Sequence, residues 1–114
     1  MRIWVVAILA MLGTGTIAAT QSDISEYAKL SAEFDARQGK PELAADKRMA
    51  LADCVLSAFE AERGAENIPQ LLGLMRAVAA GIQFDDPVVV EFTKSHGDSY
   101  AQIVRKCQNS INNG

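Results

Sequence analysis

The clearest hydrophobic pattern in the chain is the stretch MALADCVLSAFEAERG at residues 49–64, which is apolar around most of a helical circumference. Between Met49 and Phe59 only Asp53 and Ser57 are polar, and they lie with Asp46 and Glu60 on one narrow strip. A helix that is apolar on nearly all sides is enclosed by other elements. The pattern therefore predicts a central helix with its neighbours packed around it.

Glycine and proline residues divide the rest of the chain into segments of helical length. Proline favours the first turn of a helix, and glycine favours the position just past its end. This punctuation predicts helices at residues 23–38, 41–63, 68–80, 87–96 and 99–111. The run PVVVEF at residues 87–92 has strand propensity, but nothing else in the chain offers it a partner strand. The expected fold is all-α, a compact bundle of about five helices around the central helix 41–63.

The first 19 residues, MRIWVVAILAMLGTGTIAA, have the layout of a secretory signal peptide, with one positive charge, an apolar run and then small residues. The apolar run from Ile3 to Leu12 is shorter than the about 20 residues that a helix needs to cross a bilayer. Cleavage is expected after Ala18 or Ala19, with the second slightly favoured. We therefore expect a periplasmic or secreted protein without a stable membrane anchor, with residues 20–114 forming a single domain.

Cys54 and Cys107 are the two cysteines of the chain. An even number of cysteines in an oxidising compartment favours a disulfide, which here would stabilise the fold by about 4 kcal/mol at most. A free reactive thiol is the alternative, and it would need a nearby base or a helix N-terminus. Cys54 instead lies in mid-helix among apolar residues. The sequence therefore predicts a Cys54–Cys107 disulfide between the helices 41–63 and 99–111.

Composition and motifs exclude several classes of function. The net charge is −3, and it becomes −4 if Arg2 leaves with the signal peptide. An acidic chain with scattered Lys and Arg residues lacks the basic patch that nucleic-acid binding needs. Glycine-rich phosphate loops, paired CxxC motifs and serine-centred elbows do not occur in the sequence. No cofactor and no nucleic-acid partner are therefore expected.

His96 is the single histidine of the chain. It is expected at the end of the helix 87–96, where the helix dipole favours its protonated form. As a catalytic base it would need a nucleophile, and Cys54 or Cys107 could serve only if unbridged. His96 and Asp98 are possible metal ligands, but no third ligand follows at the spacing of a metal site. We predict a protein without catalytic residues or a metal site, with an unrecognised small hydrolase as an alternative.

The loop GIQFDDP at residues 81–87 is a candidate partner-binding segment. It carries Phe84, an aromatic residue of the type enriched at interface hot spots, beside Asp85 and Asp86. Asp86 is expected to cap the next helix, which leaves the charge of Asp85 without a structural role. The competing interpretation, slightly favoured, is that Phe84 turns inward and fills the core.

A second candidate surface lies in the segment 68–84, where Arg76 is the single charged residue. The small residues Gly73, Ala77 and Ala80 lie opposite its leucine-rich face and would let another helix approach closely. An internal helix is the commoner neighbour for such a face. The alternative is a partner surface or a homodimer, because exposed apolar patches on small proteins tend to be binding sites.

The segments LADCVLSAFEA and SYAQIVRKCQ, in an exported all-helical chain of this size, resemble the small periplasmic immunity proteins that protect bacteria against type VI secretion amidases. This resemblance implies inhibition of a cell-wall-cleaving enzyme by a protruding loop. Acid-stress periplasmic chaperones share the same outline of export, helices and one disulfide. We therefore expect a protein that acts by binding another protein, an inhibitor or immunity protein first and a chaperone second.

Overall fold

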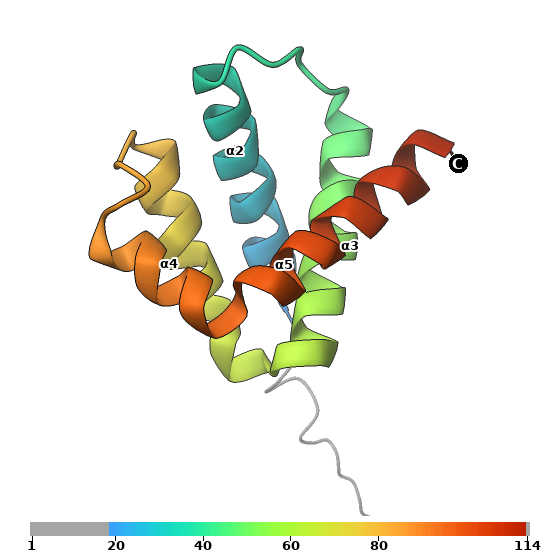
Figure 1. Ribbon diagram of the computed structural model, residues 1–114. Helices are drawn as coiled ribbons and strands as arrows, with labels where there is room; N and C mark the ends of the chain where they lie inside the picture. The colour runs from blue at the N-terminus through green and yellow to red at the C-terminus, as the bar shows by residue number, and fades with distance from the viewer. Residues whose placement is uncertain (1–18, 114) are drawn as a thin grey trace, which may run out of the picture.

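The computed structural model describes residues 19–113, which form four α-helices and one short 3₁₀ turn (Figure 1). The elements are α2 (Gln21–Arg37), α3 (Ala45–Arg63), η2 (Ala65–Asn67), α4 (Ile68–Ala79) and α5 (Pro87–Asn113). No strand occurs in this part of the chain, so the all-α prediction is confirmed. The predicted signal peptide, apart from Ala19, lies outside the described residues. In residues 19–113, no helix combines the length and the hydropathy of a membrane span.

α5 is one helix where the sequence predicts two, so the prediction of about five helices is wrong by one. Gly97 and Asp98 continue the helix instead of ending one and capping the next. A glycine inside a helix costs about 1 kcal/mol relative to alanine. The continuous helix offsets this cost because it places three rings, one turn apart, around the buried ring of Phe59. Their centroids lie 6.0, 5.4 and 6.3 Å from Phe59 in the order Phe92, His96 and Tyr100.

The starts of the first two helices also differ from the prediction. α2 begins at Gln21, because Thr20 and Asp23 form a capping box in which each side chain accepts a hydrogen bond from the backbone N–H of the other. α3 begins at Ala45 and not at Pro41. Proline is tolerated in a first helical turn but does not require one. The residues from Pro41 to Ala44 instead form a connection in which Leu43 packs against the core.

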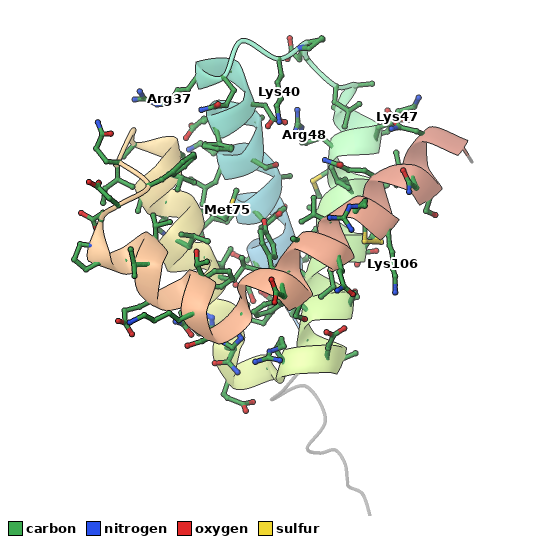
Figure 2. The ribbon with its side chains drawn as sticks, viewed as in Figure 1. Arg37, Lys40, Lys47, Arg48, Met75 and Lys106 are labelled. Carbon is green, nitrogen blue, oxygen red and sulfur yellow. A yellow bond between two sulfur atoms is a disulfide. The ribbon has the colours of Figure 1, made fainter. Side chains whose placement is uncertain are left out.

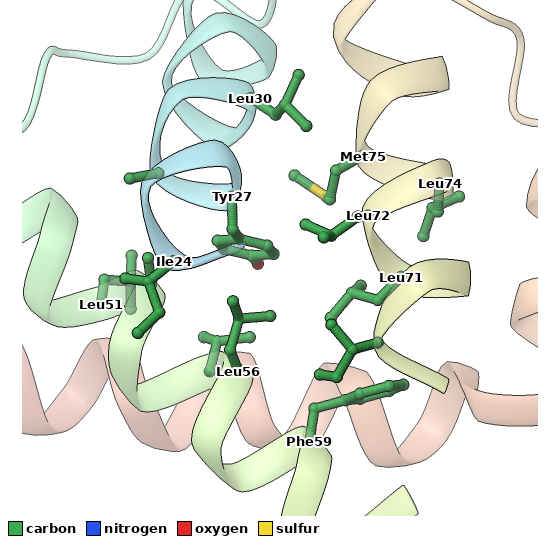
Figure 3. Close-up of a cluster of buried hydrophobic side chains, with 14 of the residues drawn as sticks. Ile24, Tyr27, Leu30, Leu51, Leu56, Phe59, Leu71, Leu72, Leu74 and Met75 are labelled. Carbon is green, nitrogen blue, oxygen red and sulfur yellow. The ribbon is translucent and has the colours of Figure 1, made fainter. Parts of the chain in front are cut away.

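α3 is the central helix, as predicted, because it contacts every other element. α5 lies along one side of α3 and α2 along another, while α4 packs mainly against α2 (Figure 1). The most completely buried side chains are Val55, Leu56, Phe59 and Leu71. They form the centre of one continuous core with the inner face of α2 (Figure 3). On the opposite side of α3, Asp53 and Ser57 are exposed, which confirms the polar strip.

The predicted disulfide joins Cys54 in α3 to Cys107 in α5, with the two Cα atoms 5.9 Å apart. Cys107 is buried and Cys54 is half-buried. Closer to the C-terminal end of α3, the carboxylate of Glu60 accepts a hydrogen bond of 2.7 Å from the backbone N–H of Ala19. The disulfide thus fixes the C-terminal part of α5 covalently to the middle of α3.

Candidate functional site

A groove of about 630 Å³ separates α2 from α5. In the described chain, no Cα atom of α2 lies within 8 Å of a Cα atom of α5, and α5 crosses obliquely in front of α3 and α2 (Figure 1). The groove is lined mainly by apolar side chains from all four helices, and Phe84 lies at its edge. A volume of this size falls in the range of about 300–1,000 Å³ that is typical of ligand sites. The groove is therefore the first candidate site of the molecule.

Two tyrosines bridge the groove from its opposite walls. The hydroxyl oxygens of Tyr27 in α2 and Tyr100 in α5 lie 2.5 Å apart, and the Tyr100 hydroxyl also donates to the sulfur of Met75 at 3.7 Å. Burial is the main cause that raises the pKa of Tyr27 well above its usual value, and it raises the pKa of Tyr100 to about 12. Both hydroxyls are therefore neutral near pH 7, and this bridge adds a polar but uncharged contact to the groove.

One wall of the groove carries a charged cluster made by Asp35, Lys40 and Arg48. Figure 2 shows Lys40 and Arg48 of this cluster. Arg48 is only 7% exposed, and its Nη1 donates to an Asp35 carboxylate oxygen at 2.8 Å and to the Ser31 hydroxyl at 3.5 Å. The Lys40 ammonium lies 4.0 Å from the other oxygen of Asp35. With two cations and one anion, the cluster has a net charge of +1 in a chain whose net charge is −3.

The same cluster borders a second, smaller cavity of about 270 Å³. This cavity lies between the α2–α3 connection and the C-terminal part of α5, and Glu42, Leu43 and Ile111 line it. Arg48, Leu51 and Gln108 line both the groove and the smaller cavity. The charged cluster thus stands where two hollows of the surface meet.

The 81–86 connection, which contains the predicted partner-binding residues Phe84, Asp85 and Asp86, is anchored at both ends. At its start, Gly81 has a φ of 94° and closes the end of α4 with a hydrogen bond of 3.0 Å to the Val78 carbonyl. At its end, Asp86 accepts a hydrogen bond of 3.0 Å from the backbone N–H of Val88, so it caps α5 as expected.

Phe84 does not fill the core, contrary to the interpretation that the sequence slightly favours, because its side chain is 62% exposed. Its ring centroid lies 6.3 Å from that of Phe34 at the edge of the groove. Asp85 is exposed as well. The connection therefore presents an aromatic ring and a carboxylate to solvent next to the groove.

The small-residue face of α4 has no internal helix close against its glycine. A Cβ atom built on Gly73 would meet nothing within 4 Å, Ala77 is half-buried and Ala80 is exposed. The internal neighbour that the sequence favours is thus not found at Gly73. The homodimer through this face stays a prediction.

His96 occupies a different environment from the predicted one, because α5 continues past it and the ring does not lie at the C-terminal end of its own helix. Its ring is buried, and Nδ1 accepts a hydrogen bond of 2.9 Å from Nε of Arg63. Nε2 lies 3.2 Å from the side-chain oxygen of Gln70, so this network assigns the proton of a neutral ring to Nε2. Burial first, and then the charge of Arg63, lower the pKa of His96. The expectation of a protonated histidine is therefore wrong.

The part of the chain that the structure describes offers few side chains for chemistry based on a thiol or a metal ion. Both cysteines are held in the disulfide, so neither is a free nucleophile beside His96. Within residues 19–113, no group of three or more His, Cys, Asp or Glu side chains is arranged to hold a metal ion.

Sequence reasoning missed the groove and the role of Arg48. A signal for Arg48 was present, because it stands three, four and seven residues before Leu51, Ala52 and Val55 and so shares their buried helical face. A charged residue in register with an apolar stripe marks a buried charge that needs partners. No comparable signal in the sequence shows that α5 would leave α2 uncovered.

No protein-family model, curated protein or solved structure matches the chain. Function therefore has to be inferred from the groove, the charged cluster and the 81–86 connection.

Proposed function

We propose that this is a small exported, non-enzymatic protein that acts by binding another protein, in the manner of an inhibitor or immunity protein of a cell-wall-targeting enzyme. The observation that carries the proposal is the exposed ring of Phe84 on a connection anchored at both ends. A binding residue on a rigid scaffold loses little conformational entropy when a partner docks. Exposed aromatic residues in such places are typical interface anchors.

The surroundings of Phe84 support the same proposal. Nε of Arg37 in α2 donates a hydrogen bond of 2.7 Å to the carbonyl of Ala79, and so ties the end of α4 to α2 just before the connection. Asp85, whose carboxylate caps nothing, adds a charge that a basic partner surface could pair with. The resemblance of the two cysteine-bearing helices to periplasmic immunity proteins implies inhibition by a protruding loop, and we assign that role to the 81–86 connection.

Capture of a partner from a periplasmic extract tests the proposal. The mature protein carries an affinity tag and is compared with the double variant Phe84→Ala/Asp85→Ala and with the control Val90→Ala/Glu91→Ala, which changes exposed residues on α5. We expect one partner, retained in stoichiometric amount by the wild type and the control and lost by the loop variant, with the melting temperature unchanged. Equal retention by all three proteins contradicts the proposal.

A periplasmic chaperone is the second candidate, and the environment of His96 favours it. Protonation of the buried ring at low pH would break the hydrogen bond from Arg63 and weaken the contact between α3 and α5. Apolar core surface would then become accessible in acid, which is how an acid-activated chaperone could gain clients. Suppression of the aggregation of an unfolded test protein at pH 4 but not at pH 7 would favour this candidate over a single-partner inhibitor.

A further inference from the structure

The starting observation is a buried guanidinium with only one of its nitrogens paired. Nη1 of Arg48 makes both hydrogen bonds that this side chain forms with described residues. Arginine has five N–H donors, so Nε–H and the two Nη2–H groups have no protein acceptor in that part of the chain. Arg48 is only 7% exposed, so little of its surface is open to bulk water. Buried donors of a charged group are costly unless an acceptor reaches them.

The surroundings of Arg48 define what kind of acceptor fits. The Asp35–Lys40–Arg48 cluster has a net charge of +1, which one negative charge neutralises. The Nε and Nη2 groups lie on one edge of a planar fork, and a carboxylate is the anion that matches such an edge with two parallel hydrogen bonds. The other charges on the groove lining, Asp98 and Arg105, balance one another. The carboxylate of Glu42, which lines the smaller cavity, would repel a second negative charge on the ligand.

The rest of the groove is apolar and suits an aliphatic chain. Beyond the cluster, the lining is dominated by aliphatic and aromatic side chains, among them Phe34, Leu74, Val78, Val89 and Phe92. An α-helix with its side chains is about 10–12 Å wide, so a groove of about 630 Å³ admits little more than one helical turn. A slender ligand therefore fits this groove better than a helix of a partner protein.

We propose that the groove between α2 and α5 binds a single-chain amphiphile with a carboxylate head, that is, a molecule of the fatty-acid class. The carboxylate accepts hydrogen bonds from Nε and Nη2 of Arg48, with Lys40 and Gln108 beside it, and the aliphatic chain covers the apolar lining. This binding site does not rest on the proposed protein partner. Failure to capture a partner leaves it unchanged.

Titration calorimetry on the mature protein tests the proposal with octanoate, decanoate and dodecanoate as probes, each below its micellar concentration. We expect one site, with Kd falling about fourfold for each added methylene, since each buried CH₂ contributes about 0.8 kcal/mol. An alkyltrimethylammonium ion with the same tail as decanoate should bind at least tenfold more weakly. Equal affinity for the two head groups, or no binding of any carboxylate, overturns the proposal.

Two tryptophan variants of α5 separate the groove from the rest of the surface. Ala101 is exposed and lines the groove, whereas its neighbour Gln102 is exposed and lies outside it. We expect Ala101→Trp to weaken decanoate binding at least tenfold and Gln102→Trp to leave it unchanged. Equal binding by both variants overturns the proposal, as does binding only to vesicles of an anionic phospholipid, which would indicate a membrane surface as the ligand.

A third variant tests the head-group contact. Arg48→Lys keeps the positive charge but removes the donor edge formed by Nε and Nη2. We expect about tenfold weaker binding of decanoate and unchanged binding of the alkyltrimethylammonium ion. Unchanged decanoate affinity contradicts the assigned contact. If Arg48→Lys does not fold, the comparison of Ala101→Trp with Gln102→Trp decides the proposal.

Discussion

The two sides of α5 differ in how they meet the rest of the molecule. Toward α3, α5 is held by the disulfide and by the rings around Phe59, and the contact is closed. Toward α2, the two helices touch only across the groove, where one pair of tyrosine hydroxyls bridges them. The contact with α3 carries stability, whereas the gap toward α2 leaves surface available for binding. α5 is thus closely packed on one side and, on the other, borders the groove that we propose as a binding site.

The largest expected effect is the loss of the ring at the centre of the α3–α5 contact. Phe59 has no exposed surface, so Phe59→Ala should lower the free energy of unfolding by about 3–5 kcal/mol. Urea denaturation followed by circular dichroism measures the change. Phe84→Ala is the matched control because that ring is 62% exposed, and it should lower the free energy by far less. Similar losses for both variants would contradict the contrast between the two sides.

Removal of the disulfide should have the next largest effect. We expect the variant Cys54→Ser/Cys107→Ser to be less stable than the wild type by about 2–4 kcal/mol, because the unfolded chain loses its covalent constraint. The same urea experiment measures the difference. Thiol titration of denatured, unreduced periplasmic protein provides the check. Two titratable thiols per molecule would show that the bond does not form in the cell.

Acid should weaken the α3–α5 contact through His96. The pKa of this ring is lowered in the folded state, so below about pH 6.5 the unfolded chain binds a proton that the native protein resists. The free energy of unfolding should therefore fall as the pH decreases from 7 toward 5. His96→Gln removes this contribution, and the difference between the two pH profiles isolates it from the carboxylates. Parallel profiles would refute the assignment.

The bridge across the groove should matter less. Tyr27→Phe removes one hydroxyl of the Tyr27–Tyr100 pair, and we expect a loss of about 0.5–1.5 kcal/mol, the usual range for one hydrogen bond. Thermal unfolding followed by circular dichroism suffices as the measurement. A loss as large as that of Phe59→Ala would mean that the α2–α5 side carries as much stability as the α3–α5 side.

The smallest effect is expected on the outer face of α4, which belongs to neither side of α5. Gly73 lies inside a helix with open space around its position, so Gly73→Ala should stabilise the protein by about 0.5–1 kcal/mol. Stability should be measured together with the sedimentation coefficient at several concentrations. Concentration-dependent association that weakens in Gly73→Arg would favour the homodimer, and a strictly monomeric wild type would exclude it.

The sequence was sufficient for features that depend on local chemistry or on counting. The period of apolar residues in α3 predicted its central place, and the two cysteines allowed one pairing. Prediction from the sequence failed where packing between helices decides which of two locally plausible helix boundaries is formed. Gly97 and Asp98 look like a helix end, yet the rings of Phe92, His96 and Tyr100 need a continuous helix to reach Phe59. Local signals around Pro41 likewise said nothing about Leu43 packing on the core.

The candidate site was less accessible to prediction than the fold. The exposed position of Asp85 and the capping role of Asp86 follow from short-range rules, and both are found. The direction of Phe84 depends on Phe34, which lies 50 residues earlier in the chain, and the wrong alternative was favoured. The groove depends on the angle at which α5 crosses α2, and no pattern within either helix encodes that angle.

The disulfide has a topological consequence for the 81–86 connection. Cys54 and Cys107 lie on either side of this connection in the chain, so the bond closes a covalent ring that contains it. A protease that cut the exposed peptide beside Phe84 would open the ring without releasing a fragment, because both pieces would still be joined through sulfur. The nicked protein would keep its mass on a non-reducing gel and separate into two chains only after reduction. Loss of the connection's shape could thus go unnoticed by any assay that measures size alone.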